Sequence, residues 1–360
     1  MKFGNQTSWM LALAIVAMPL AAKAQYTFID LNPSGFDGSM AFGISGSQQV
    51  GFGGGPGGYH ALLWSGTAAS AADLNPSGFT YASANGISGS QQVGYGNGPS
   101  TGGNSHALLW SGTAASAVDL NPSGFDSSLA YGISGGQQVG FGTTGGHDHA
   151  LLWSGTAASA VDLNPSGFYW SVAYGISGSQ QFGYGNSPGG YHALLWSGTA
   201  ASAVDLNPSG YDSSAASGIS GGQQVGAGWM GGGPSHALLW YGTAASAVDL
   251  NPSGFFASYA LGISGSQQVG YGVTNGVRRA LLWSGTAASA VDLQNFLSSD
   301  YTSSQAQGID ANGNIVGSAL NSSTGQWDAI LWVAIPEPST FALAGLGAAA
   351  LFILRRHKRV

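Results

Sequence analysis

Short apolar runs alternate with polar, glycine-rich segments along most of the chain, and the alternation recurs in register. In one copy the apolar runs are Ala41–Ile44, Gln49–Phe52, His60–Trp64 and Ala71–Leu74. The segments between them contain Ser-Gly or Asn-Pro-Ser-Gly, which are typical of tight turns. No window between residues 25 and 334 has the spacing of an amphipathic helix. The pattern therefore predicts four short antiparallel strands in each copy.

Three sequence markers give the number of copies. The dipeptide Asp-Leu, the segment Gly-Ile-Ser and the segment Leu-Leu-Trp each occur seven times, with small changes in the last copy. The Asp-Leu markers are 43 to 46 residues apart and begin at Asp30, Asp73, Asp119, Asp162, Asp205, Asp249 and Asp292. Four strands in about 43 residues is the size of a propeller blade. We therefore expect an all-β, seven-bladed β-propeller, with a β-solenoid as the alternative.

The order of the first and last runs indicates how such a ring would close. The last copy ends after its third run, at Trp332, and has no fourth run. The chain begins with an extra copy of the fourth run, Tyr26–Leu31. We expect this N-terminal strand to complete the seventh blade and so remove an unpaired sheet edge.

The two ends of the chain differ from the repeats. Residues 1–24 contain Lys2, an apolar run and the ending Ala22-Lys23-Ala24, which predicts a secretory signal peptide cleaved after Ala24. Residues 335–360 contain an apolar run, residues 341–354, followed by basic residues. A helix of that length rises only about 21 Å, less than the roughly 30 Å hydrocarbon core. We expect a short C-terminal transmembrane sorting helix that holds the protein transiently in the inner membrane.

This tail resembles the PEP-CTERM sorting signal. The resemblance rests on Pro336, Glu337 and Pro338, on the apolar run, and on Arg355 and Arg356. It implies that a sorting protease of the exosortase type removes the tail and that the protein reaches the cell surface or the extracellular matrix. Similar tails also carry the label of the C-terminal region of ice-binding proteins, which leaves ice binding as a less favoured function.

The repeats resemble the HAF family of extracellular repeats. The matching segments in one copy are Gly86-Ile87-Ser88, Gln92-Val93-Gly94 and His106–Trp110. The resemblance implies an extracellular β-repeat protein and brings no catalytic activity with it.

The charge of the repeats excludes one class of partner. Between residues 25 and 334 there are fourteen Asp and two Arg, a net charge near −12, and the chain has no cysteine. Nucleic-acid binding needs clustered cations to neutralise phosphates, so we expect no nucleic-acid partner. Stability must come from packing and β-ladders rather than from disulfides.

Three motifs could carry chemistry, but each has a structural explanation. The serine-hydrolase pattern Gly-x-Ser-x-Gly occurs at Gly132–Gly136, where a strand-to-strand turn is predicted. Equivalent blade positions lie too far apart to share one metal ion, so we interpret the repeated histidines as structural; they are His60, His106, His149, His192 and His236. The repeated Asp before Asn-Pro favours a turn over a calcium loop. We expect no catalytic residues, no metal and no cofactor.

The copies differ mainly in two connections. These are the one between the second and third strands and the one that follows Asn-Pro-Ser-Gly. In an antiparallel meander both connections lie on the same face, which we call the variable face; variable loops on a rigid scaffold often bind ligands. The aromatic residues expected there are Tyr59, Tyr169, Trp170, Tyr191 and Trp229. Flat aromatic rings suit sugars, so we expect a non-enzymatic surface or matrix protein that binds exopolysaccharide, with a purely structural role as the alternative.

Overall fold

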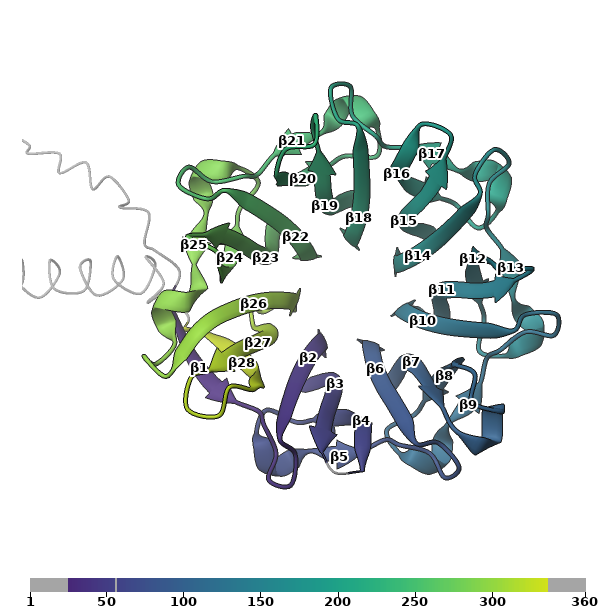
Figure 1. Ribbon diagram of the computed structural model, residues 1–360, viewed down its shortest axis with the longest axis horizontal. Helices are drawn as coiled ribbons and strands as arrows, with labels where there is room; N and C mark the ends of the chain where they lie inside the picture. The colour runs from purple at the N-terminus through teal and green to yellow at the C-terminus, as the bar shows by residue number, and fades with distance from the viewer. Residues whose placement is uncertain (1–24, 56, 336–360) are drawn as a thin grey trace, which may run out of the picture. The chain divides into compact units, whose positions relative to one another are not determined.

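The computed structural model describes residues 25–55 and 57–335, which form one compact unit of seven four-stranded sheets. The sheets are the blades of a propeller and surround a central axis (Figure 1). The predicted seven-bladed propeller is confirmed, and the β-solenoid is excluded because each sheet contains only strands of one blade.

Within a blade, strands are antiparallel, and in blades 1 to 6 they follow chain order from the axis outward (Figure 1). In blade 7 the outer strand comes from the start of the chain. The innermost strands of blades 1 to 7 are β2 (Gly38–Ser45), β6 (Tyr81–Ser88), β10 (Ser127–Ser134), β14 (Trp170–Ser177), β18 (Ser213–Ser220), β22 (Ala257–Ser264) and β26 (Tyr301–Ile309). The second strands are β3 (Gln48–Gly55), β7 (Gln91–Asn97), β11 (Gln137–Thr144), β15 (Gln180–Ser187), β19 (Gln223–Trp229), β23 (Gln267–Thr274) and β27 (Ile315–Asn321).

The third strands end on the repeated tryptophan or just beyond it. They are β4 (Gly58–Trp64), β8 (His106–Trp110), β12 (His147–Trp153), β16 (Gly190–Trp196), β20 (Ser235–Trp240), β24 (Val277–Trp283) and β28 (Trp327–Ile335). The outer strands of blades 1 to 6 have two residues each and are β5 (Ala72–Asp73), β9 (Val118–Asp119), β13 (Val161–Asp162), β17 (Val204–Asp205), β21 (Val248–Asp249) and β25 (Val291–Asp292).

Short 3₁₀ turns are the helical elements of the described residues. They are η1 (Ala68–Ser70), η2 (Pro99–Thr101), η3 (Ala114–Ser116), η4 (Ala157–Ser159), η5 (Ala200–Ser202), η6 (Ala244–Ser246), η7 (Ala287–Ser289) and η8 (Leu293–Phe296). Six of them, with η2 and η8 apart, share the sequence Ala-Ala-Ser between the third and outer strands, where the serine hydroxyl accepts hydrogen bonds from the turn's backbone.

The ring closes through the N-terminal strand, as predicted. Strand β1 (Gln25–Asp30) pairs with β28 over six residue pairs, from Gln25 with Ile335 to Asp30 with Ile330. Figure 1 shows the purple β1 beside the yellow end of the chain. Leu31 continues the pairing, because its amide donates to the carbonyl of Ala329 at 2.8 Å. The seventh blade therefore combines both ends of the repeat region.

The core lies between neighbouring blades rather than within one sheet. One cluster combines Val50 and Leu63 of blade 1 with Leu108 and Trp110 of blade 2, all nearly or fully buried. The third-strand tryptophan of every blade is fully buried. Because one sheet cannot cover its own apolar face, each blade depends on the next, as in other repeat proteins.

Two repeated glycines allow close approach of the backbone, one between neighbouring blades and one within a blade. A Cβ at Gly132 would lie 2.9 Å from the Cα of Gly175 in the next blade. At Gly140 it would lie 1.8 Å from the carbonyl oxygen of Leu129, beside the β-bulge where β10 shifts register between Ala130 and Gly132. These contacts explain why the Gly-Ile and Val-Gly dipeptides recur.

The predicted signal peptide and sorting helix lie outside the described residues. None of the helical elements within residues 25–55 and 57–335 has the length and hydropathy of a membrane span.

Candidate functional site

The structure places the two variable connections of each blade on the same face. In the strand order of every blade, the loop between the second and third strands and the link to the next blade leave from the same edge. The conserved turns, after the first and third strands, lie at the opposite edge. The variable face is therefore where this chain distinguishes one blade from another.

A cavity of about 720 Å³ opens on the variable face between blades 4 and 5. Blade 4 contributes three aromatic residues to its wall, Trp170, Tyr184 and Tyr191. Blade 5 contributes the wall residues Asp212, Ser213, Ala215, Trp229 and Gly232. A volume of this size is in the range of small-molecule sites.

The three rings of blade 4 form a concave corner. Trp170 and Tyr184 are 5.4 Å apart between centroids and inclined by 74°, and Trp170 and Tyr191 are 5.6 Å apart and inclined by 47°. Tyr184 and Tyr191 meet edge to face at 6.3 Å. All three rings line the cavity, so each is available for contact with a ligand.

Behind this corner, an aromatic row continues to the inner strands. Tyr184 stacks on Tyr174 at 5.7 Å, and Tyr174 stacks on Tyr131 of blade 3 at 4.7 Å. Burial raises the pKa of Tyr174 and Tyr131 well above the ordinary tyrosine value, with neighbouring tyrosines adding to the effect. Both hydroxyls stay protonated to higher pH than an exposed tyrosine, so the row is an uncharged layer behind the cavity wall.

Blade 5 has two small side chains, Ala215 and Ala227, that leave room for the cavity, and blade 2 shares only the first of them, as Ser83 opposite Tyr95. Ala215 occupies the position of Met40 in blade 1, Leu129 in blade 3 and Tyr259 in blade 6, as the strand pairings show. Ala227, behind Ala215 on β19, replaces a ring such as Phe52 or Tyr271 of other blades. The space that larger side chains fill in blades 1, 3 and 6 is open at blade 5.

The loop that follows Trp229 is shaped by Asp212. A carboxylate oxygen of Asp212 accepts a hydrogen bond from the amide of Gly231 at 2.6 Å, and the Asp212 amide donates to the carbonyl of Trp229 at 2.9 Å. These bonds hold the indole-bearing end of β19 beside the carboxylate. Asp212 is the one ionisable acid among the residues that line this cavity.

Three of the five predicted aromatic residues meet at this cavity, namely Trp170, Tyr191 and Trp229. Tyr59 lies apart, on the wall of a separate cavity of about 360 Å³ with Trp327, and contacts Phe52 and Tyr81. Tyr169 is 57% exposed and does not line the cavity. Sequence reasoning missed Tyr184, Asp212 and Ala215, although the small residue at Ala215 is visible when the copies are aligned.

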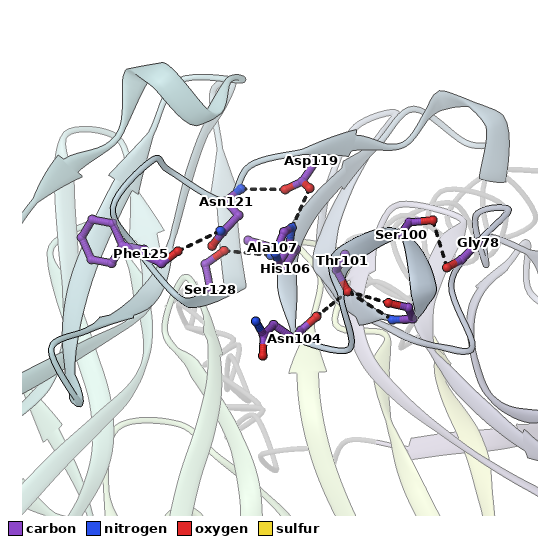
Figure 2. A network of polar contacts seen from close by, with 11 residues as sticks. Gly78, Ser100, Thr101, Asn104, His106, Ala107, Asp119, Asn121, Phe125 and Ser128 are labelled. Carbon is purple, nitrogen blue, oxygen red and sulfur yellow. Dashed lines mark hydrogen bonds and ion pairs between the residues drawn. The ribbon is translucent and has the colours of Figure 1, made fainter.

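The five repeated histidines form structural pairs with the repeated aspartates. In blade 2, Nδ1 of His106 lies 2.6 Å from an oxygen of Asp119, whose other oxygen accepts from the amide of Asn121 (Figure 2). In the same region, the amide of Ala107 donates to the hydroxyl of Ser128 in blade 3 and so ties the two blades together (Figure 2). The equivalent pairs are His60–Asp73, His149–Asp162, His192–Asp205 and His236–Asp249.

The other motifs are also turns. Ser134 ends β10, and Gly135 and Gly136 turn the chain into β11 with φ of +57° and +80°. One carboxylate oxygen of Asp310 accepts from the amides of Asn312 and Asn314, which is a turn of the chain on itself. Residues 25–55 and 57–335 contain no group of three or more His, Cys, Asp or Glu placed to hold a metal ion.

Comparison with protein families found one match, at the C-terminus. Residues 334–359 match the family described as the PEP-CTERM protein-sorting motif. The match implies export and a C-terminal sorting signal. Comparison with curated proteins found no match.

Comparison with solved structures shows the fold. The β-propeller domain of the Trilobed protease from Pyrococcus furiosus is 9% identical with a TM-score of 0.53, covering 82% of this chain and 94% of that chain. The acylaminoacyl peptidase of Pyrococcus horikoshii is 10% identical with a TM-score of 0.54, and the match covers 88% of this chain and 55% of the peptidase chain. The Pyrococcus furiosus domain is described as having an open velcro topology, whereas here β1 pairs with β28.

Proposed function

We propose that this chain is a non-enzymatic surface or matrix protein that binds extracellular polysaccharide at the cavity between blades 4 and 5. The observation that carries the proposal is the gathering of Trp170, Tyr184, Tyr191 and Trp229 around one open cavity. Aromatic rings with polar neighbours at the rim bind the apolar faces of sugar rings while the sugar hydroxyls stay hydrated or find acceptors.

The sorting tail supports a location outside the cell. A protein that carries a PEP-CTERM motif is exported, and we propose that an exosortase-like protease then removes the tail after transient anchoring in the inner membrane. We keep the HAF-type assignment of the repeats as part of the same proposal, since it too implies an extracellular protein. The peptidase neighbours contribute the fold alone, because their identity to this chain is about one residue in ten.

The proposal is tested with residues 25–335, which form a closed unit with their own core. The assay measures retention on the extracellular polysaccharide of the producing cell, with salt and simple sugars as competitors. We expect saturable retention that sugars release. Retention that only salt releases, or none at all, would contradict the proposal and favour a structural matrix component.

Repeat-derived variants locate the site with little risk to the fold. Trp170→Ser copies Ser127 of blade 3, and Trp229→Thr copies Thr143 of the same blade. Each ring contributes roughly 1 kcal/mol beyond its burial, so each variant should weaken binding about fivefold or more. Tyr59→Ala removes a ring on the same face but away from the cavity and should leave the affinity unchanged.

A further inference from the structure

Between blades 6 and 7 the chain places a cation of its own where blades 4 and 5 have the cavity. The guanidinium carbon of Arg278 lies 5.1 Å from the ring centroid of Tyr271. The Arg278 guanidinium also donates to the side-chain oxygen of Gln305 on β26 of blade 7, at 3.2 Å. Arg278 therefore crosses from one blade to the next over an aromatic face, a favourable cation–π arrangement.

The strand pairings show that three residues of the cavity are the counterparts of these three. Tyr184 corresponds to Tyr271, because each follows Gly on the second strand and pairs with the third-strand alanine. Tyr191 corresponds to Arg278, since they pair with Asn186 and Val273 at the same step of the second strand.

The third correspondence is between the receiving residues. Ala215 corresponds to Gln305, because each directly precedes the alanine that pairs with the second-strand glycine. At blades 4 and 5 the chain therefore keeps the aromatic ring but has Tyr191 in place of the cation and Ala215 in place of the amide, and the cavity lies beside these residues.

The charges around the cavity suit a cation from outside. Asp212 supplies a carboxylate to its wall, and no basic residue lines it. The whole repeat region has two Arg against fourteen Asp, so its field attracts cations and repels anionic ligands. Four aromatic side chains and one carboxylate line the cavity, and this combination suits ammonium groups.

We propose that the cavity between blades 4 and 5 binds an organic ammonium ion, and that it selects amino sugars whose amino group is free rather than acetylated. This inference rests on the proposed function, because it names the sugar class that the polysaccharide site prefers. The ammonium lies in the cavity beside Asp212 and against its aromatic wall, next to the Tyr191 ring that stands where Arg278 stands between blades 6 and 7. The sugar ring then lies against Trp170, Tyr191 and Trp229.

The test compares two ligands that differ in one group. Calorimetric titration of residues 25–335 uses glucosamine hexasaccharide and N-acetylglucosamine hexasaccharide, at mildly acidic pH and physiological salt. We expect the free-amine hexasaccharide to bind at least about tenfold more tightly, and choline to displace it. Asp212→Asn should remove most of this preference, whereas the affinity for the acetylated ligand should change little.

A double variant separates the cavity from general attraction to an acidic protein. Tyr191→Arg with Ala215→Gln copies the residues of blades 6 and 7 into blades 4 and 5 and should fill the site, lowering the glucosamine affinity at least about tenfold. Tyr59→Arg adds the same charge at the equivalent position of blade 1 and should change the affinity less than twofold.

The outcomes distinguish the two proposals. Equal affinity for both hexasaccharides, or an equal effect of Tyr59→Arg and the double variant, overturns the ammonium inference even if the native polysaccharide is retained. Loss of all polysaccharide retention overturns the proposed function as well. A preference for the free amine that the double variant abolishes and Tyr59→Arg leaves intact supports both.

Discussion

Because strand β1 closes the ring, we predict that the buried Leu31 controls the local detachment of β1 from β28 rather than the unfolding of the whole domain. Leu31 and Leu163 are equivalent, fully buried residues that follow the outer strands of blades 7 and 3. Replacing either by alanine should cost about 2–5 kcal/mol, the usual range for a buried leucine. In residues 25–335, however, β1 has a free end, so it can leave β28 while the other blades stay folded. β13 is continuous with the chain on both sides and cannot.

Leu31→Ala should therefore act mainly on the opening of β1. A loss of about 2 kcal/mol increases the open population roughly 30-fold, and larger losses increase it further. Hydrogen exchange of residues 25–31, and of those β28 amides that donate to β1, should accelerate by this factor in Leu31→Ala. Exchange in blades 2 to 5 should stay close to that of the unmodified protein.

Leu163→Ala is the matched control. It should lower the global midpoint of unfolding and leave β1 protected until the whole domain opens. If both variants gave the same exchange pattern, β1 would not be a separate opening unit, and the assignment of the closure to one releasable strand would be wrong.

Three further predictions concern buried polar groups. Burial, with a smaller contribution from Asp310, raises the pKa of Tyr26 from 10.0 to about 12. The protonated Tyr26 hydroxyl therefore contributes its full stabilisation below pH 10, and this contribution is lost as the pH rises to 12. Tyr26→Phe should reduce the loss of unfolding free energy at alkaline pH by up to roughly 3 kcal/mol in denaturant titrations. Trp332→Phe removes an indole hydrogen bond to a backbone carbonyl and should cost about 1 kcal/mol more than Trp283→Phe, whose indole has no protein partner; equal thermal shifts would refute this. Desolvation raises the pKa of Asp328, with the Asp30 carboxylate adding to the effect. Ionisation of Asp328 therefore lowers the stability of the folded protein as the pH rises above 3.8. Asp328→Asn should raise the melting temperature at pH 7, and the increase should be smaller at pH 4.

The sequence by itself determined the architecture. Turn residues at fixed spacing separate the strands, and seven copies of one blade-sized unit leave few alternatives once the extra fourth run, Tyr26–Leu31, is counted at the other end. The repeated glycines and the Asp-Asn turns are local requirements of backbone geometry, so they were readable from single copies. The predicted outer run Ala71–Leu74 became a strand of only two residues, because Asp73 turns the chain by accepting from the amide of Asn75.

Only the tertiary structure decided which candidate residues form a site. Trp170 and Trp229 come from different blades, and their meeting depends on how blades 4 and 5 pack. The small side chain of Ala215 leaves room for the cavity, and this room becomes a site only because the rings of blade 4 lie beside it. Tyr59 and Tyr169 have the same residue type and the same face but different neighbours, and the sequence pattern does not encode neighbours across blades. Packing between copies, and not the repeat itself, brought the aromatic residues of blades 4 and 5 together around one cavity.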